Sequence, residues 1–333
     1  MSLPCNATIS YLSTVDFHSL VLHSISALEI PTHIFGATII ILKTPKSMSS
    51  VKWEMLNLHF WSSLVDLFTS TLAIPFMVYP DLAGYALGVL TGLGVNVVVQ
   101  AVMFVTAVGV MFMAMQMVYE NRYFQMSPDN LLWKRCRVPF HIVNYTVALT
   151  ISIPFVLTIP DQESAVPMIS GHYPYSCYAP NTSFFVFTTN SLPFAITFGI
   201  VGMTEGALMV TFLLLTIRVL RLKTRQKNMS TRTLSLQKRF LFSLVAQTTI
   251  PIIVIFFPFI YLVFSMTAAY HNQVYNNFAF IILSLHGFCS TVIMLMVHQP
   301  YRLATLGVFG YKRTQKTFAT SIVRFSVNHR VST

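Results

Sequence analysis

Three acidic side chains lie near the middle of long apolar segments: Glu29, Asp66 and Glu205. An ionised carboxylate at the centre of a membrane helix costs about 2.5–3.5 kcal/mol, so each group needs a proton, a cation or hydrogen-bond partners. These segments contain no Lys or Arg, and the imidazole of His286 in a later apolar segment is the candidate partner. Sharing a proton or cation would make the cluster functional. The alternative is a set of structural, hydrogen-bonded side chains.

A second group of charged residues follows the third apolar segment, in the sequence Tyr119-Glu120-Asn121-Arg122-Tyr123. Glu120 and Arg122 are expected to lie close enough along the helix end to interact, and such a pair can act as a switch. The other interpretation is that any helix emerging from a membrane into the cytoplasm ends in charged residues.

Residue patterns typical of enzymes are missing from the sequence. The cysteines are Cys5, Cys136, Cys177 and Cys289, and their spacing matches neither a zinc site nor a redox dithiol. No paired Asp motif, Ser–His arrangement or H-E-x-x-H helix is present. The sequence therefore predicts no enzymatic activity, no metal and no cofactor.

Apolar segments of membrane-spanning length position these residues. The 333 residues are 54% hydrophobic and 9% charged, with a mean hydropathy of +0.65, whereas soluble domains carry about 25% charged residues. About 20 apolar residues cross a bilayer as a helix. Seven such segments are predicted, at residues 20–42, 55–78, 95–119, 139–160, 193–217, 240–266 and 278–298. The fold class is thus an all-α integral membrane protein, a seven-transmembrane helix bundle.

The positive charges lie on one side of this topology. All 21 Lys and Arg residues fall in the connections 43–54, 120–138 and 218–239 or after residue 298, and none falls in a span. Because Lys and Arg concentrate in cytoplasmic loops, the N-terminus is expected outside and the C-terminus in the cytoplasm. A miscounted span would send later basic loops to the wrong side, so the segregation also supports the number seven.

This topology divides the chain into an extracellular segment 1–19, a membrane domain 20–298 and a basic cytoplasmic tail 299–333. The net charge of +11 belongs to loops rather than to a basic face of a soluble fold, so nucleic acid is not an expected partner. Eight cations and no acid lie between Arg218 and Arg239. Acidic lipid headgroups, a partner protein, or both are the alternatives for that loop.

Glycosylation tests the predicted topology. The sequons at Asn6 and Asn181 fall on the predicted outer side, and a third at Asn228 falls on the cytoplasmic side. Glycosidase is expected to shift the mobility of the protein on a gel, Asn6→Gln with Asn181→Gln to abolish that shift, and Asn228→Gln to leave it unchanged. Sugar on Asn228 would contradict the topology.

Four short motifs at the span boundaries resemble those of the nematode serpentine receptor class H chemoreceptors, called Srh, in the Str superfamily. They are Lys43-Thr44-Pro45-Lys46-Ser47-Met48 with Val51-Lys52-Trp53, then Glu120-Asn121-Arg122-Tyr123, Pro160-Asp161-Gln162 and Pro300-Tyr301-Arg302. Each motif is short, but their order and placement make the set specific, and the resemblance runs almost end to end.

The resemblance implies a chemosensory receptor that binds a small-molecule ligand and activates a heterotrimeric G protein. It further implies a multi-pass protein of the plasma membrane, in the cilium of a chemosensory neuron. The residues expected to form the G-protein coupling switch are Glu120, Arg122, Tyr123, Pro300, Tyr301 and Arg302. Unlike rhodopsin-like receptors, the third span opens without a cysteine, which leaves Cys5–Cys177 as the expected disulfide on the oxidising outer face.

A membrane transporter or channel is the alternative function. Transporters show repeated halves and broken helices with paired charges, and no internal repeat is evident in this sequence. A seven-span channel of the insect odorant type has its N-terminus inside, against the charge distribution. An opsin needs a lysine in its seventh span for the retinal Schiff base, and no span contains one.

Overall fold

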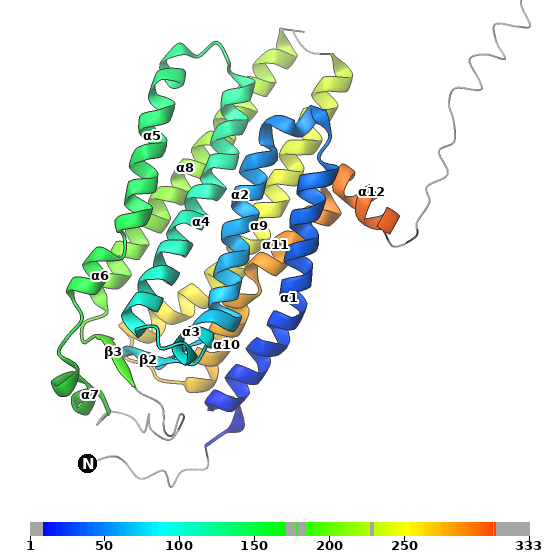
Figure 1. The fold of residues 1–333 in the computed structure, drawn as a ribbon. Coiled ribbons are helices and arrows are strands. Elements are labelled where there is room, and N and C mark those ends of the chain that lie inside the picture. Colours follow the sequence, from blue (N-terminus) through cyan, green and yellow to red (C-terminus); the bar gives the residue numbers. More distant parts are fainter. Residues whose placement is uncertain (1–8, 171–177, 179–183, 227–229, 309, 311–333) are drawn as a thin grey trace, which may run out of the picture.

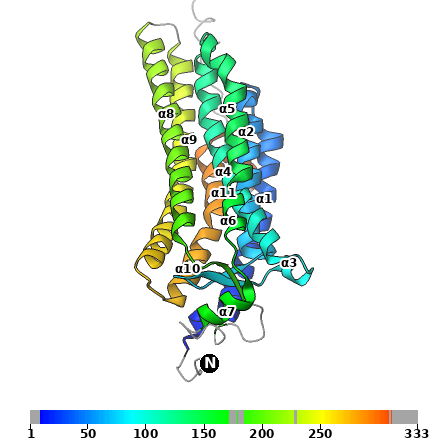
Figure 2. The same cartoon turned by 90° about the vertical axis from the view of Figure 1, so that its left-hand side faces the viewer.

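The computed structural model describes residues 9–170, 178, 184–226, 230–308 and 310. Long helices run side by side and form an elongated bundle (Figures 1 and 2). The long helices are α1 (Val15–Lys43), α2 (Ser49–Leu67), α4 (Val97–Met126), α5 (Leu131–Thr150), α8 (Leu192–Arg225), α9 (Thr231–Thr267), α10 (Gln273–Ser284) and α11 (His286–Val297). The shorter ones are η1 (Tyr11–Ser13), η2 (Lys46–Met48), α3 (Val89–Gly92), α6 (Ile153–Leu157), α7 (Gln162–Ser170) and α12 (Gln299–Val308).

Each predicted span has a counterpart among these helices. In order, the spans are α1, α2, α4, α5 with α6, α8, α9, and α10 with α11. Among the described residues, six of these segments are long and apolar enough to cross a membrane. The seventh, α2, carries Lys52, Glu54 and Asp66 within its 19 residues, which lowers its hydropathy, and a π-helical turn, η3 (Phe68–Leu72), extends it.

The second span ends earlier than the predicted residue 78. Its helix stops at Leu72, and because Pro75 has no backbone N–H it cannot continue a helical ladder. The chain turns into strand β1 (Pro75–Met77), which pairs antiparallel with β2 (Leu82–Ala86). A third strand, β3 (Phe185–Thr188), pairs antiparallel with β2. This three-stranded sheet was not predicted from the sequence.

The sheet and the basic residues mark opposite ends of the bundle, here called the sheet end and the basic end. β2, β3, α7 and the N-terminal end of α1 lie together at the sheet end (Figure 1). The cations of the described chain belong to the termini of α1, α2, α4, α5, α8 and α9 at the other end, to η2 and to α12. Helix α12 packs beside α1 and α11 there.

Helix α4 is the central element of the bundle. It packs against α2, α5 and α8, and its buried face is lined by small and flexible residues such as Ala107, Ala114 and Met111. The outward faces of α8 and α9 instead expose large apolar side chains, including Met203 and Phe257. An exposed apolar belt of this kind is what a bilayer covers.

Candidate functional site

Asp66 is completely buried on α2 and touches the seventh span where that span is broken. Helix α10 ends at Ser284 and α11 begins at His286, so the first N–H groups of α11 lack partners within their own helix. Asp66 Oδ1 accepts from the backbone N–H of Gly287 at 3.0 Å, and Oδ2 accepts from that of Phe288 at 2.7 Å. A carboxylate from one span thus caps the helix of another.

Two imidazole rings also contact the Asp66 carboxylate. His286 Nδ1 lies 2.7 Å from Oδ1, and His33 Nε2 of α1 lies 3.2 Å from Oδ2. With the two backbone donors, each carboxylate oxygen faces two nitrogen atoms, which suits an ionised group that only accepts hydrogen bonds. Asp66 therefore joins three spans at one buried point.

Gly287 permits this close approach. A Cβ added at this position would lie 2.6 Å from Asp66 Oδ2 and 2.8 Å from the backbone oxygen of Ser62. Any larger residue would push α11 away from α2, because these contacts are closer than van der Waals packing allows. The glycine is thus part of the Asp66 site.

Glu29, His59 and Thr291 surround the central group. Glu29 on α1 is fully buried, its Oε2 accepts from the Ser70 hydroxyl at 2.9 Å, and its Oε1 has no partner among the described residues. It lies close enough to interact electrostatically with Asp66. His59 Nε2 lies 2.9 Å from a backbone oxygen of α1, and its Nδ1 lies 3.4 Å from Thr291 Oγ1.

The structure brings together three of the four predicted intramembrane residues, Glu29, Asp66 and His286. Glu205 does not join them: it lies on α8, which packs against α4 and α9, and its Oε2 has no hydrogen-bond partner in the described chain. The sequence reasoning missed His33 and His59. Their spacing offers a signal, since His33 is four residues after Glu29 and His59 seven before Asp66, placing each pair on one helix face.

At the basic end, Glu120 is buried at the end of α4 and binds residues of α5. Its carboxylate accepts from Arg137 Nε at 3.0 Å and from the Trp133 indole N–H at 2.8 Å, and His141 Nε2 lies 3.2 Å from Oε2. The imidazole and guanidinium recur four residues apart on α5, which places both on the face toward α4. Glu120 thus fastens the third span to the fourth.

Arg122 points the other way, toward α9. Its guanidinium stacks on the Phe240 ring at 4.2 Å and donates hydrogen bonds to the side chains of Gln237 and Gln125. The structure therefore does not pair Glu120 with Arg122, because residues two apart on a helix point in different directions. Instead, neighbouring charges on α4 hold α5 and α9 separately.

The motif Pro300-Tyr301-Arg302 contacts the connection between the first and second spans. Tyr301 is fully buried, and its hydroxyl lies 2.8 Å from Thr44 Oγ1 at the end of α1. Pro300 occupies the first turn of α12, while Arg302 is exposed and donates to the Met296 carbonyl at 3.3 Å. Motifs far apart in sequence therefore meet at the basic end.

Tyr123, the last residue of the predicted coupling set on α4, packs on Phe212 of α8 and accepts a hydrogen bond from Asn130 at 3.0 Å. Four other predicted sites lie outside the described residues: Asn6, Asn181, Cys5 and Cys177. The predicted glycans and disulfide therefore stay predictions.

A small apolar cavity lies at the sheet end, between the sheet and the helices. Its volume is about 110 Å³, and it is lined by aromatic rings, among them Tyr79, Phe104, Phe155, Phe187, Phe194 and Phe280. Among the described residues of its wall, the one side-chain amide is Gln100, which already donates to Thr91 Oγ1 at 3.0 Å and to the Val95 carbonyl at 2.8 Å. The cavity therefore presents mainly apolar surface.

Seven helical segments, an apolar cavity at the sheet end and buried charged residues at the basic end fit a seven-transmembrane receptor. The model of the serpentine type 7TM GPCR chemoreceptor Srh family matches residues 13–311, and the chain belongs to that family. It is 24% identical over 299 residues to serpentine receptor class H-72 of Caenorhabditis elegans, covering 86% of this chain and 83% of that protein.

Proposed function

We propose that this receptor binds a small apolar molecule in the cavity at the sheet end and activates a heterotrimeric G protein at the basic end. The proposal rests on the length of α4, which extends from the cavity to the basic end. Its first turns supply Ala101 and Phe104 to the cavity wall, and its last two turns carry Glu120 and Arg122. At 1.5 Å per residue the helix is about 45 Å long, so one rigid element contacts both sites.

The charge distribution supports the placement of this receptor in the membrane. The basic end would face the cytoplasm, in accord with the positive-inside rule, and the sheet end would face the outside. The expected location is the plasma membrane of a chemosensory cilium, where an outer cavity meets odorants or other small molecules.

The cavity limits the ligand to a compact, apolar molecule. The volume of about 110 Å³ is smaller than the apolar cavity of about 150 Å³ that accommodates benzene, so it suits a short-chain compound or a single ring no larger than benzene. A polar group on the ligand would lose its water in this cavity and find few hydrogen-bond partners, because the Gln100 amide is already hydrogen-bonded.

Filling the cavity is expected to abolish the response to ligand. Ala101→Phe adds a ring to the cavity wall and should reduce the ligand response at least about tenfold, because one lost apolar contact of this size is worth about 1.5–3 kcal/mol. Val99→Phe adds the same ring to an exposed position of α4 and is the control. The measurement is a G-protein reporter response in cells with matched surface expression, screened against small volatile and soluble compounds.

An Ala101→Phe receptor that responds like the Val99→Phe control would place the ligand elsewhere. No nucleotide exchange by the unmodified receptor with any of several G-protein classes would instead reject G-protein activation.

A further inference from the structure

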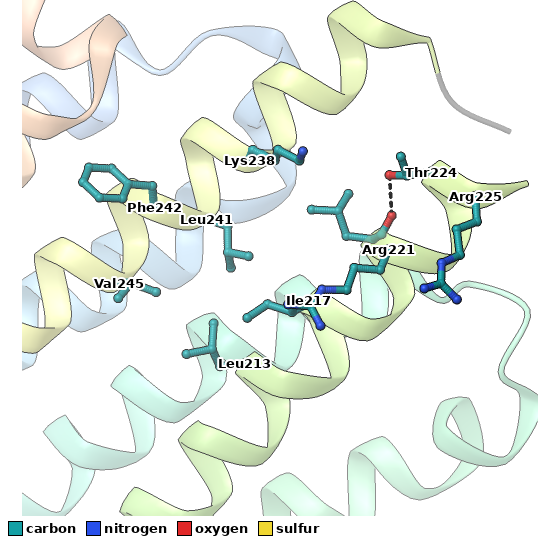
Figure 3. Close-up of a pocket in the computed structure, with 10 residues that line it drawn as sticks. Leu213, Ile217, Arg221, Thr224, Arg225, Lys238, Leu241, Phe242 and Val245 are labelled. Carbon is teal, nitrogen blue, oxygen red and sulfur yellow. Dashed lines mark hydrogen bonds between the residues drawn. The ribbon is translucent and has the colours of Figure 1, made fainter. Parts of the chain in front are cut away.

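A groove runs between α8 and α9 at the basic end (Figure 3). It has a volume of about 670 Å³, within the range of about 300–1,000 Å³ found for ligand pockets. Apolar side chains line one part, including Leu213 and Ile217 of α8 and Leu241 and Val245 of α9. The groove is thus far larger than the cavity at the sheet end.

Three cations surround the other part of the groove. Arg221 and Arg225 come from the last turns of α8, and Lys238 comes from the facing turn of α9 (Figure 3). All three are exposed, and none forms an ion pair with a residue that the structure describes. The sequence holds no acid after Glu205, so the parts of α8 and α9 that line the groove supply no counter-charge to these cations.

The outer edge of the groove is open to the bilayer, while its floor rests on the bundle core. On α9, Lys238 and Val245 each lie one position after the inward-facing Gln237 and Leu244, and Leu213 and Val245 pack against the core. Phe242 at the groove edge is 71% exposed, which suits contact with lipid chains. From Leu213 to Arg225 the groove extends about 18 Å along the helix, enough to run from the hydrocarbon region to the headgroup level.

We infer that this groove binds one anionic phospholipid of the basic-side leaflet, with its phosphates on Arg221, Arg225 and Lys238 and an acyl chain against the apolar wall. Charge complementarity selects the headgroup, because juxtamembrane cations attract anionic lipids. The apolar wall, at the depth of hydrocarbon, selects a lipid over a soluble phosphate. A bound lipid would bridge α8 and α9. Helix α9 is also the helix that Arg122 contacts from the bundle interior, through Phe240.

Lipid binding to the full-length receptor in neutral detergent tests this inference. The probe is a fluorescent phosphatidylinositol bisphosphate carrying two acyl chains, compared with phosphatidylcholine of the same chains. The triple change Arg221→Gln, Arg225→Gln and Lys238→Gln is expected to weaken binding of the anionic lipid about 30-fold, since each cation near a headgroup contributes about fivefold or less. Binding of phosphatidylcholine should stay weak and unchanged.

The chain offers a control with the same loss of charge. Arg218, Lys223 and Arg239 lie on the same two helices but do not line the groove. Their triple change to glutamine should alter binding less than about threefold. If the groove variant unfolds in detergent, the single change Arg225→Gln at the exposed end of α8 supplies the same comparison, with an expected loss of about fivefold.

Three results would overturn the inference. Equal losses in the two triple variants would mean diffuse charge attraction without a site. Competition by the deacylated headgroup as effective as that by the intact lipid would mean a soluble phosphate site. Normal lipid binding by the groove variant with lost G-protein coupling would assign the groove to the partner protein.

Discussion

Asp66→Ala receptors are expected to be largely absent from the cell surface. The change removes the acceptor of two backbone N–H groups of α11 and the partner of two buried histidines. Breaking a buried charged network costs about 3–5 kcal/mol, a large part of the total stability of about 5–15 kcal/mol for a folded protein. Surface labelling and thermal unfolding of the solubilised receptor measure the effect.

The matched control is Glu163→Ala, which removes an exposed carboxylate of α7. It should leave both the surface level and the unfolding temperature unchanged. Gly287→Ala provides an independent check, because its Cβ would collide with Asp66 Oδ2 and should reproduce part of the loss. Normal expression of Asp66→Ala would show that the cap is not needed for the fold.

Asp66→Asn separates a signalling role from a structural one. The amide keeps one oxygen but replaces the other acceptor with a donor. It also removes the negative charge of Asp66, with which Glu29, His33 and His286 interact. If the cluster sets the resting state of the bundle, basal signalling should change, or lose its dependence on sodium or pH, at matched surface expression. Flat, wild-type-like curves near neutral pH, with and without sodium, would end that hypothesis.

Arg122→Ala is expected to leave surface expression and ligand binding intact while abolishing nucleotide exchange on the G protein. The guanidinium lies at the basic end, at the opposite end of α4 from the cavity, so the change should not alter the ligand site. Exchange should fall at least about tenfold, because we expect the guanidinium to bind the G protein once it leaves Gln237, and a charged hydrogen bond contributes about 1.5–3 kcal/mol. Arg135→Ala, which removes an exposed cation of α5, is the control.

Gln237→Leu tests whether the contact with α9 holds the resting arrangement. It removes the hydrogen-bond acceptor of Arg122 but keeps the arginine, so α9 should move more freely and basal exchange should rise about tenfold. Gln237→Leu frees α9 but keeps the arginine for the G protein, whereas Arg122→Ala removes the arginine itself, so the two substitutions are expected to have opposite effects. An Arg122→Ala receptor that signals normally would show that the contact between Arg122 and α9 is not a switch.

Several features of the site followed from side-chain chemistry alone. The cost of a charge in hydrocarbon selected Asp66 and His286, and the structure places them 2.7 Å apart. The same argument selected Glu205, which does not lie in the cluster. The free-energy cost of a charge in hydrocarbon indicates that a partner is needed, but not which helix supplies it. The pairing of Glu120 with Arg122 failed for a local reason, the directions of residues two apart on a helix.

The sequence by itself determined the class of fold, the number of spans and the family, because membrane helices satisfy their own backbone hydrogen bonds and need only a long apolar segment. Only the tertiary structure decided the partners: the cap that Asp66 provides to Gly287 and Phe288, and the contact of Arg122 with Phe240. The sheet beside the cavity is also a product of tertiary structure, since β3 comes from a connection far in sequence from that of β1 and β2. Which helix faces reach each other depends on packing across the bundle, and span-by-span apolar patterning carries no information about it.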